Sequence, residues 1–230
     1  MKKYLVIGGS SGIGEALANK LSNDGHNVLA SYNENKKSDI GNITYFPLDV
    51  TADELDVSLL PDSIDGLIYC PGAITLKPFH RLKKEAFLED LDVQVFGAIS
   101  VIQHVLDRLK KGVNPSIVLF SSVAAQNGFN FHSLVSVSKG AIEGLTKSLS
   151  AEFAPTIRVN AIAPSITNTP LASKLLSNEQ KIEANAERHP LKKIGTPEQI
   201  AGLASFLLSD EASWITGQII TVDGGISTIK

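Results

Sequence analysis

Short apolar runs alternate with helical patterns along the whole chain. The apolar runs have the length of buried strands and lie at residues 4–7, 28–32, 43–48, 67–70, 117–120, 157–162 and 218–222. Apolar residues at helical spacing predict helices over residues 13–21, 91–109, 133–153 and 197–208. Strands that alternate with helices predict an α/β fold, in which a doubly wound parallel sheet carries helices on both faces.

Two stretches interrupt this alternation. Residues 51–61 are too few for a long crossover, so we expect one short helix there. Residues 165–193 form an irregular polar stretch. Because no linker, repeat or low-complexity segment separates the elements, we expect residues 1–230 to form a single domain.

Composition narrows the functional classes. The net charge of −3 gives no reason to expect nucleic acid or an anionic membrane as a partner. No apolar run approaches the length of a membrane span, and the first residues carry charge without an apolar signal core. The single cysteine, Cys70, excludes an internal disulfide and favours a reducing compartment. We therefore expect a cytoplasmic protein.

A glycine-rich segment lies between the first predicted strand and the first predicted helix, with the spacing Gly8-x-x-x-Gly12-x-Gly14. Unpaired N–H groups at a helix start bind anions, and glycines let a pyrophosphate approach the backbone. The segment thus favours a nucleotide site, and the alternative is a plain turn between strand and helix. The candidate nucleotide-binding residues here are Gly8, Ser10, Ser11, Gly12, Ile13 and Gly14.

The spacing of this loop resembles that of the short-chain dehydrogenase/reductase family, whose loop usually reads Thr-Gly-x-x-x-Gly-x-Gly. Ile7 stands in place of the threonine. The resemblance continues along nearly the whole chain. It implies a Rossmann-like fold, a bound nicotinamide dinucleotide, and hydride transfer to or from the carbonyl or alcohol carbon of a small-molecule substrate.

The adenosine end of the predicted site lacks the acidic residue that NAD-specific dehydrogenases carry after the second strand. In this chain the position of that acidic residue falls near Ser31, and no carboxylate follows until Glu34. Ser31 and Asn33 can donate hydrogen bonds to a 2′-phosphate, and Lys36 and Lys37 lie close by in sequence. We therefore favour NADP over NAD as the cofactor, although the two lysines can equally belong to a solvated loop.

Three further segments resemble nucleotide contacts of the family. Asp49 and Val50 match an Asp-Val pair whose aspartate accepts from the adenine amino group, although Asp49 can instead cap the following turn. Gly72 is the one residue kept from an Asn-Asn-Ala-Gly segment, and its lack of a side chain lets the ribose approach. By the resemblance, the backbone at Ile166 and the hydroxyl of Thr169 hold the nicotinamide carboxamide.

The catalytic residues implied by the resemblance are only partly present. Ser122 occupies the position of the serine that binds the carbonyl oxygen, and Lys139 that of the lysine that holds the nicotinamide ribose. Val135 replaces the tyrosine that exchanges the hydroxyl proton, and Gln94 replaces the asparagine of the proton relay. No tyrosine occurs after Tyr69, so a shifted alignment does not supply one. Reduction of a carbonyl nevertheless creates alkoxide character that must be protonated.

Three explanations of the missing tyrosine stay open. Another group can supply the proton, either His132, one helical turn before Val135, or Tyr69. His132 can instead be an ordinary residue of a loop-to-helix junction, and Tyr69 can instead pack in the core. Alternatively the protein binds the nucleotide without hydride chemistry, as a sensor or as an inert partner of an active relative. In the third explanation it turns over slowly on an activated carbonyl that needs little help from an acid.

The C-terminal third departs from the family at Ser165, which replaces a glycine. Residues of about 165–193 correspond to the segment that covers the substrate, and their polar character identifies no substrate group. The two long predicted helices, residues 91–109 and 133–153, carry apolar and small residues beyond one stripe. In the family these helices pair across a two-fold axis, which implies a homodimer or homotetramer.

Overall fold

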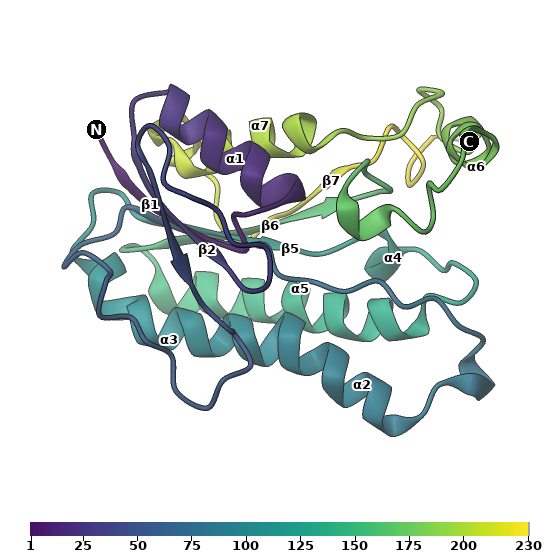
Figure 1. Ribbon diagram of the computed structural model, residues 1–230, viewed down its shortest axis with the longest axis horizontal. Coiled ribbons are helices and arrows are strands. Elements are labelled where there is room, and N and C mark those ends of the chain that lie inside the picture. The colour runs from purple at the N-terminus through teal and green to yellow at the C-terminus, as the bar shows by residue number, and fades with distance from the viewer. Residues whose placement is uncertain (230) are drawn as a thin grey trace.

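The computed structural model describes residues 1–229 and contains one parallel sheet of seven strands in the order β3-β2-β1-β4-β5-β6-β7 (Figure 1). The strand order reverses next to β1, as it does in doubly wound folds, so the predicted Rossmann-like α/β architecture is confirmed. The strands are β1 Lys3–Ile7, β2 Asn27–Tyr32, β3 Ile43–Pro47, β4 Gly66–Tyr69, β5 Ser116–Phe120, β6 Arg158–Pro164 and β7 Ile219–Val222.

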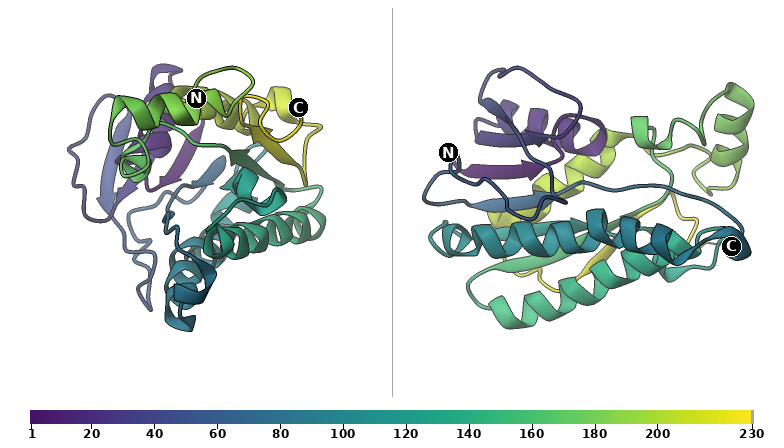
Figure 2. Two further views of the ribbon diagram at one scale, coloured as in Figure 1. Left: turned by 90° about the vertical axis from the view of Figure 1, so that its right-hand side faces the viewer. Right: turned by 60° about the horizontal axis from the view of Figure 1, so that its bottom comes forward.

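Helices cover both faces of the sheet (Figure 1, Figure 2). α1 and α7 lie against one face, and the long helices α3 and α5 lie against the other. The α-helices are α1 Gly12–Asn23, α2 Lys84–Leu91, α3 Gly97–Lys110, α4 Val123–Gln126, α5 Ser133–Phe153, α6 Glu179–Glu187 and α7 Pro197–Leu208.

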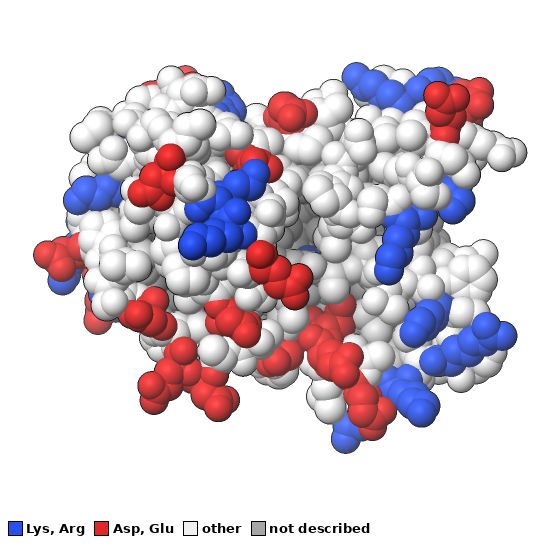
Figure 3. All heavy atoms as spheres, in the orientation of Figure 1, with Lys and Arg blue, Asp and Glu red and all other residues white. Residues whose placement is uncertain are grey.

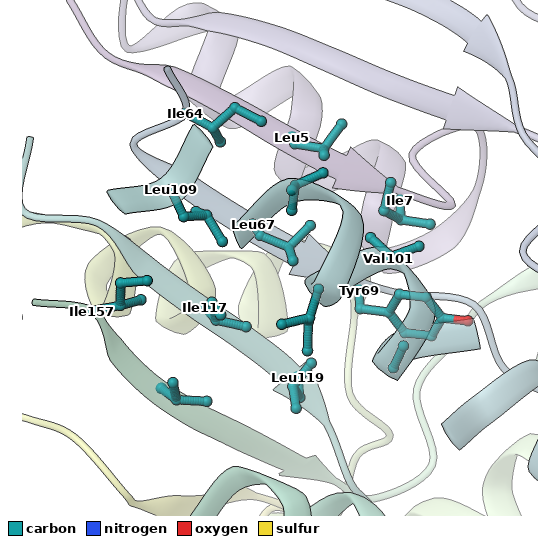
Figure 4. Packing of buried hydrophobic residues seen from close by; sticks show 14 of the residues in the cluster. Leu5, Ile7, Ile64, Leu67, Tyr69, Val101, Leu109, Ile117, Leu119 and Ile157 are labelled. Atoms are coloured by element: carbon teal, nitrogen blue, oxygen red, sulfur yellow. The ribbon is translucent and has the colours of Figure 1, made fainter. Parts of the chain in front are cut away.

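The core lies in two layers, one on each face of the sheet. Side chains alternate along β1, so Leu5 and Ile7 belong to the layer with α3, whereas Val6 belongs to the layer with α1. Figure 4 shows the first layer, in which Leu67 and Leu109 are fully buried. Because both faces are packed, the sheet is a firm base for the loops at its carboxyl edge.

Two predicted segments differ from the structure, one expected as a short helix and one as an irregular stretch. Residues 51–61 contain no helix, because the chain there follows turns in which Asp49 and Asp56 accept backbone hydrogen bonds. Residues 165–193 are not wholly irregular, because they contain α6. The side chain of Asn178 caps the start of α6 and satisfies an N–H group that the helix itself leaves unpaired.

The helix predicted over residues 91–109 is part of a longer path. The chain begins earlier, as α2, passes through the π-helical turn Asp92–Phe96 and continues as α3. A π-helical turn interrupts the regular ladder of backbone hydrogen bonds and often occurs near functional sites. The hydroxyl of Tyr69 donates to the carbonyl of Val93 within this turn. The contact fixes the π-helical turn against the end of β4.

Charged side chains of both signs are interspersed over the face of the molecule in Figure 3. This face is hollowed near its middle, between the part that carries α1 and the part that carries α6. Among residues 1–229, no helix is both long enough and apolar enough to cross a membrane.

Candidate functional site

A cavity of about 280 Å³ lies at the carboxyl edge of the sheet, where the chain leaves β4, β5 and β6. Parallel α/β sheets bind their ligands at this edge. The cavity brings together predicted site residues from separate segments, namely Ile13, Gly72, Ser122, Lys139, Ile166 and Thr169.

The glycine loop, residues 8–14, has the geometry that a bound pyrophosphate requires. Gly8 and Gly12 adopt φ values of +72° and +55°, which residues with side chains rarely adopt. A Cβ on Gly14 would lie 2.2 Å from the carbonyl oxygen of Gly8, so only glycine fits there. Within residues 1–229, the side chain of Ser11 at the N-cap of α1 makes no capping hydrogen bond. The first N–H groups of α1 are therefore available to a phosphate, and the loop fits the nucleotide.

Ser31 lies at the end of β2, where the sequence predicts it. Its side chain is 1% exposed, and its hydroxyl oxygen accepts from the N–H of Gly8 at 2.9 Å. The N–H of Gly9 also donates to the carbonyl of Ser31 at 2.9 Å. Ser31 thus anchors the glycine loop to the end of β2. This buried hydroxyl gives the loop backbone a hydrogen-bond acceptor, while a contact of Ser31 with the cofactor stays a prediction.

The two lysines near the adenosine end have different surroundings. Nζ of Lys37 donates to Glu15 at 2.7 Å, and this hydrogen bond and the attraction of the two charges raise the pKa of Lys37. Lys36 is exposed. The neighbouring Asn35 donates to the carbonyl of Ser10 at 2.8 Å, so the segment that carries Lys36 is tied to the glycine loop.

Asp49 caps the turn that follows β3. Its Oδ1 accepts from the hydroxyl and from the N–H of Thr51, at 2.7 and 2.9 Å, and these hydrogen bonds lower the pKa of Asp49. Val50 packs against Gly97, where an added Cβ would lie 3.1 Å from the Val50 side chain. The capping alternative is therefore confirmed, while contacts of Asp49 and Val50 with adenine stay a prediction.

Ser122, Val135 and Lys139 all line the cavity, and we call this part of its lining the serine–lysine wall. Nζ of Lys139 donates to the carbonyl of Phe120 at 3.0 Å. Burial lowers the pKa of Lys139 to about 8, an effect that the carboxylate of Asp90 partly offsets. Val135 is 6% exposed and offers no proton. Ser122 follows β5, and its Oγ accepts a hydrogen bond of 3.2 Å from the first turn of α4.

Gln94 is held by a buried carboxylate that sequence reasoning missed. Nε2 of Gln94 donates to Asp90 at 2.7 Å and to Ser138 at 3.2 Å, and all three residues are buried. Among residues 1–229, Oε1 of Gln94 and Oδ1 of Asp90 have no hydrogen-bond partner. A Cβ on Gly72 would lie 3.4 Å from Oε1 of Gln94 and 3.8 Å from Nζ of Lys139, so both polar atoms face one space. Such a space suits a bridging water or a ligand hydroxyl.

The two candidate proton donors occupy different environments. His132 lines the cavity at the N-cap of α5, and its Nδ1 lies 2.8 Å from the carbonyl oxygen of Asn130. Tyr69 is 3% exposed, and its hydroxyl donates to Val93. Burial raises the pKa of Tyr69 far above its usual value. Tyr69 is therefore a core residue, and of these two residues His132 is the one that lines the cavity.

Ser165 and His189 form a hydrogen-bonded pair in the cavity lining. Oγ of Ser165 lies 2.8 Å from Nε2 of His189, and Nδ1 of His189 lies 2.7 Å from the carbonyl oxygen of Asn185. His189 is 3% exposed. The sequence singled out Ser165 as a replaced glycine. It did not reveal the pair, because His189 lies in a polar stretch with no recognisable pattern.

Known proteins share this architecture over nearly the whole chain. The family model described as Enoyl-(Acyl carrier protein) reductase matches residues 8–227. Dehydrogenase/reductase SDR family member 4 of Homo sapiens is 32% identical over 241 residues, which span 97% of this chain and 87% of that protein. The structure of 4-hydroxyisoleucine dehydrogenase complexed with NADH is 26% identical, with a TM-score of 0.89 and 100% coverage of both chains. The structure of ElxO with NADP bound is 29% identical, with a TM-score of 0.88 and coverage of 98% of this chain and 99% of that chain.

Proposed function

Since this chain belongs to the short-chain dehydrogenase/reductase family, we propose that it is an NADP-dependent oxidoreductase that uses a proton donor other than tyrosine. Its substrate would be a small molecule with a carbonyl or alcohol group. The observation that carries the proposal is the cavity in which Ser122 and Lys139 meet beside the glycine loop. Holding a nucleotide does not require a serine hydroxyl there, so its presence favours use of the reactive end of the cofactor.

The residues that would hold the cofactor fall into two groups. The glycine loop and the start of α1 would hold the pyrophosphate. Lys139, Ile166 and Thr169, which all line the cavity, would hold the nicotinamide end. The bound nicotinamide supplies or accepts a hydride. The relatives solved with NADH and with NADP support a nicotinamide cofactor of either kind.

The residues of the chain itself would bind the substrate and handle its proton. Ser122 would donate a hydrogen bond to the substrate oxygen. Lys139, with a pKa lowered by burial to about 8, is mostly an ammonium group at neutral pH and would stabilise negative charge that develops there. Gln94 and Asp90 would hold a water in the space beside Gly72. The segment of residues 165–193, with α6, would cover the substrate.

Charge at the end of β2 favours NADP over NAD. Residues 30–33 contain no carboxylate that would repel a 2′-phosphate. Lys36 is exposed on the segment that Asn35 ties to the glycine loop, whereas Lys37 is already paired with Glu15. An exposed lysine contributes up to about 1 kcal/mol to such a contact.

A second candidate function is nucleotide binding without turnover. Val135 favours it, because an aliphatic side chain occupies the position of the proton donor and is buried there. The protein would then serve as a sensor of the nucleotide or as an inert partner of an active relative. The retained Ser122 argues for the oxidoreductase.

We further propose that the chain forms a homodimer or homotetramer in the cytoplasm. Phe96, in the turn before α3, is 53% exposed, and Trp214 is 98% exposed. Aromatic side chains at the surface are enriched at protein interfaces. Cys70 is free, as a reducing compartment would keep it. Sedimentation velocity at micromolar concentration tests the assembly, and a monomer would contradict it.

The function is tested by binding and turnover in one set of assays. NADPH and NADH are titrated against the protein by nicotinamide fluorescence, and NADPH is expected to bind more tightly. The protein is then incubated with NADPH and a panel of ketones and β-ketoacyl thioesters while loss of the reduced cofactor is followed. Oxidation above the blank with at least one substrate supports the oxidoreductase. Tight binding of NADPH without oxidation supports the second candidate.

A further inference from the structure

The hydrogen bonds of His189 determine where its ring proton lies. The carbonyl oxygen of Asn185 can only accept, so Nδ1 of His189, 2.7 Å away, carries a hydrogen. In the neutral ring Nε2 is then an acceptor, and the hydroxyl of Ser165 donates to it across 2.8 Å. A serine paired with a base that a second partner orients is arranged to exchange its hydroxyl proton.

Ser165 lies close to the serine that is expected to bind the substrate oxygen. Phe120 of β5 pairs with Ile162 of β6, so Ser122 and Ser165 follow the ends of adjacent strands. Adjacent strands are about 4.8 Å apart. Both serines line the cavity, together with Val135. A substrate oxygen bound at Ser122 would therefore share one cavity with the hydroxyl of Ser165.

Asp223 and the turn at Gly224 lie beside His189. The N–H of Ser165 donates to the carbonyl of Val222 at 3.2 Å, and Asp223 is the next residue along the chain. Burial alone would raise the pKa of Asp223. Hydrogen bonds within its own turn and the charge of His189 have the larger combined effect, so the pKa of Asp223 is lowered. A Cβ on Gly224 would lie 3.5 Å from Cδ2 of His189, so this turn covers the ring. Arg188 also lines the cavity, and its guanidinium lies over an aromatic ring.

We propose that Ser165 and His189 together exchange the substrate proton that a tyrosine exchanges in relatives. The proposal rests on the proposed oxidoreductase function and names its proton donor. In reduction, the carbonyl carbon gains a hydride from the reduced nicotinamide while the carbonyl oxygen gains the proton of Ser165 Oγ. The Oγ–H bond is restored by the proton on Nε2 of imidazolium His189, which becomes neutral. In oxidation both proton transfers run in reverse, and His189 ends as the imidazolium.

The first test locates the ring proton without turnover. NMR of isotope-labelled histidine reports the ring nitrogens, and His189→Gln identifies the signals of His189 among the five histidines. We expect the hydrogen of the neutral ring on Nδ1, and a shift of the Nε2 signal in Ser165→Ala. His104 is the matched control, because its Nδ1 also lies 2.8 Å from the carbonyl four residues earlier, and its signals should not move. A hydrogen on Nε2 of neutral His189 would overturn the proposal.

The second test measures NADPH-dependent reduction of the most active substrate in the panel. A positioned acid contributes about 10²–10⁴-fold, so Ser165→Ala should lower the rate about 100-fold while NADPH affinity stays within about twofold. Val135→Tyr added to Ser165→Ala should recover at least about tenfold, because it restores a phenol donor. His104→Gln, on the exposed side of α3, should keep the wild-type rate.

Several results would overturn the assignment. One is a wild-type rate in Ser165→Ala. Another is a parallel loss of NADPH affinity, which would make Ser165 a structural residue. If His132→Ala lowered the rate of NADPH oxidation more than Ser165→Ala does, His132 would be the proton donor. If the wild-type protein oxidises no NADPH with any substrate, the proposed function fails and the acid role fails with it, whichever nitrogen of His189 carries the hydrogen.

Discussion

The glycine loop and the serine–lysine wall lie at the same edge of one sheet but depend on different features of the chain. The loop acts through its backbone, and its shape depends on positive φ at Gly8 and on the missing Cβ at Gly14. The wall acts through side-chain chemistry, which Ser122 and Lys139 retain and Val135 does not. The glycine loop leaves no room for an added Cβ. The substrate proton, in contrast, can come from any acidic side chain that reaches the substrate oxygen.

On the proposed function, nucleotide binding and proton exchange depend on separate parts of the fold. Binding would use the loop, the start of α1 and the lysine of the wall. Proton exchange requires only that some acid lie near the substrate oxygen, and Ser165 follows the strand next to the one that carries Ser122. The following substitutions break one region while the other is left intact.

Gly14→Ala should give the largest effect. The new Cβ would lie 2.2 Å from the carbonyl oxygen of Gly8, so the loop must open. Overpacking of this kind costs about 1–3 kcal/mol, and 3 kcal/mol corresponds to a loss of NADPH affinity of about 100-fold. Gly112→Ala is the matched control, because its Cβ would lie 2.1 Å from the carbonyl oxygen of Ile64, far from the loop. It should lower the melting temperature but keep NADPH affinity, and equal losses of affinity would refute the role of the loop.

Val135→Tyr should raise turnover without changing nucleotide binding. The side chain lines the cavity one helical turn before Lys139, where a phenol can donate to the substrate oxygen. Because an added acid contributes about 10²-fold at the low end, the rate of NADPH oxidation should rise by about ten- to hundredfold. Val137→Tyr, on the exposed side of α5, is the control and should leave the rate unchanged. An unchanged rate in Val135→Tyr would mean that the cavity is remodelled beyond this one residue.

Lys36→Ala should distinguish NADPH from NADH. Loss of about 1 kcal/mol at an exposed phosphate contact corresponds to about a fivefold weaker affinity for NADPH, with little change for NADH. Lys20→Ala removes an exposed lysine that is paired with Asp24 instead, and should change neither affinity. Isothermal titration with both nucleotides measures the effect. Equal weakening of NADPH and NADH by Lys36→Ala would argue against recognition of the 2′-phosphate.

Asp90→Asn should change the pH dependence of nucleotide binding. The carboxylate of Asp90 raises the pKa of Lys139 against the larger effect of burial, so its removal should move that pKa below about 8. The ammonium form holds the nucleotide, and its contribution is present below the pKa and lost as pH rises through it. NADPH affinity measured against pH should therefore fall at lower pH in Asp90→Asn than in the wild type. Asp107→Asn, whose side chain is 88% exposed, should leave the profile unchanged.

The sequence predicts those parts of the fold that depend on a local period. The helix over residues 133–153 and the helix over residues 197–208 appear with the predicted bounds, because apolar spacing and Pro197 mark them within a single segment. The glycine loop is equally local. The crossover at residues 51–61 does not follow a local period, because short polar side chains there bond the backbone in turns instead of a helix.

Side-chain partners from distant segments explain the rest. The hydroxyl of Ser31 accepts from the N–H of Gly8, which lies in the glycine loop 23 residues earlier, so the sequence around Ser31 does not reveal this contact. Asp90 is a local exception, because it pairs with Gln94 four residues later but lies one residue before the predicted start of the helix at residue 91. His189 carries no pattern of its own, and only folding places it beside Ser165. No local period encodes such pairs.

We propose that this chain binds a nicotinamide nucleotide and uses it without a tyrosine. A single-turnover experiment tests both parts of this claim at once. Protein loaded with NADPH is mixed with each ketone and β-ketoacyl thioester of the panel, and the absorbance of the reduced nicotinamide is followed in time. We predict a decay faster than the blank with at least one substrate, slowed in Ser165→Ala and accelerated in Val135→Tyr. Tight NADPH binding with no decay above the blank for any substrate would contradict the claim and leave a nucleotide-binding protein.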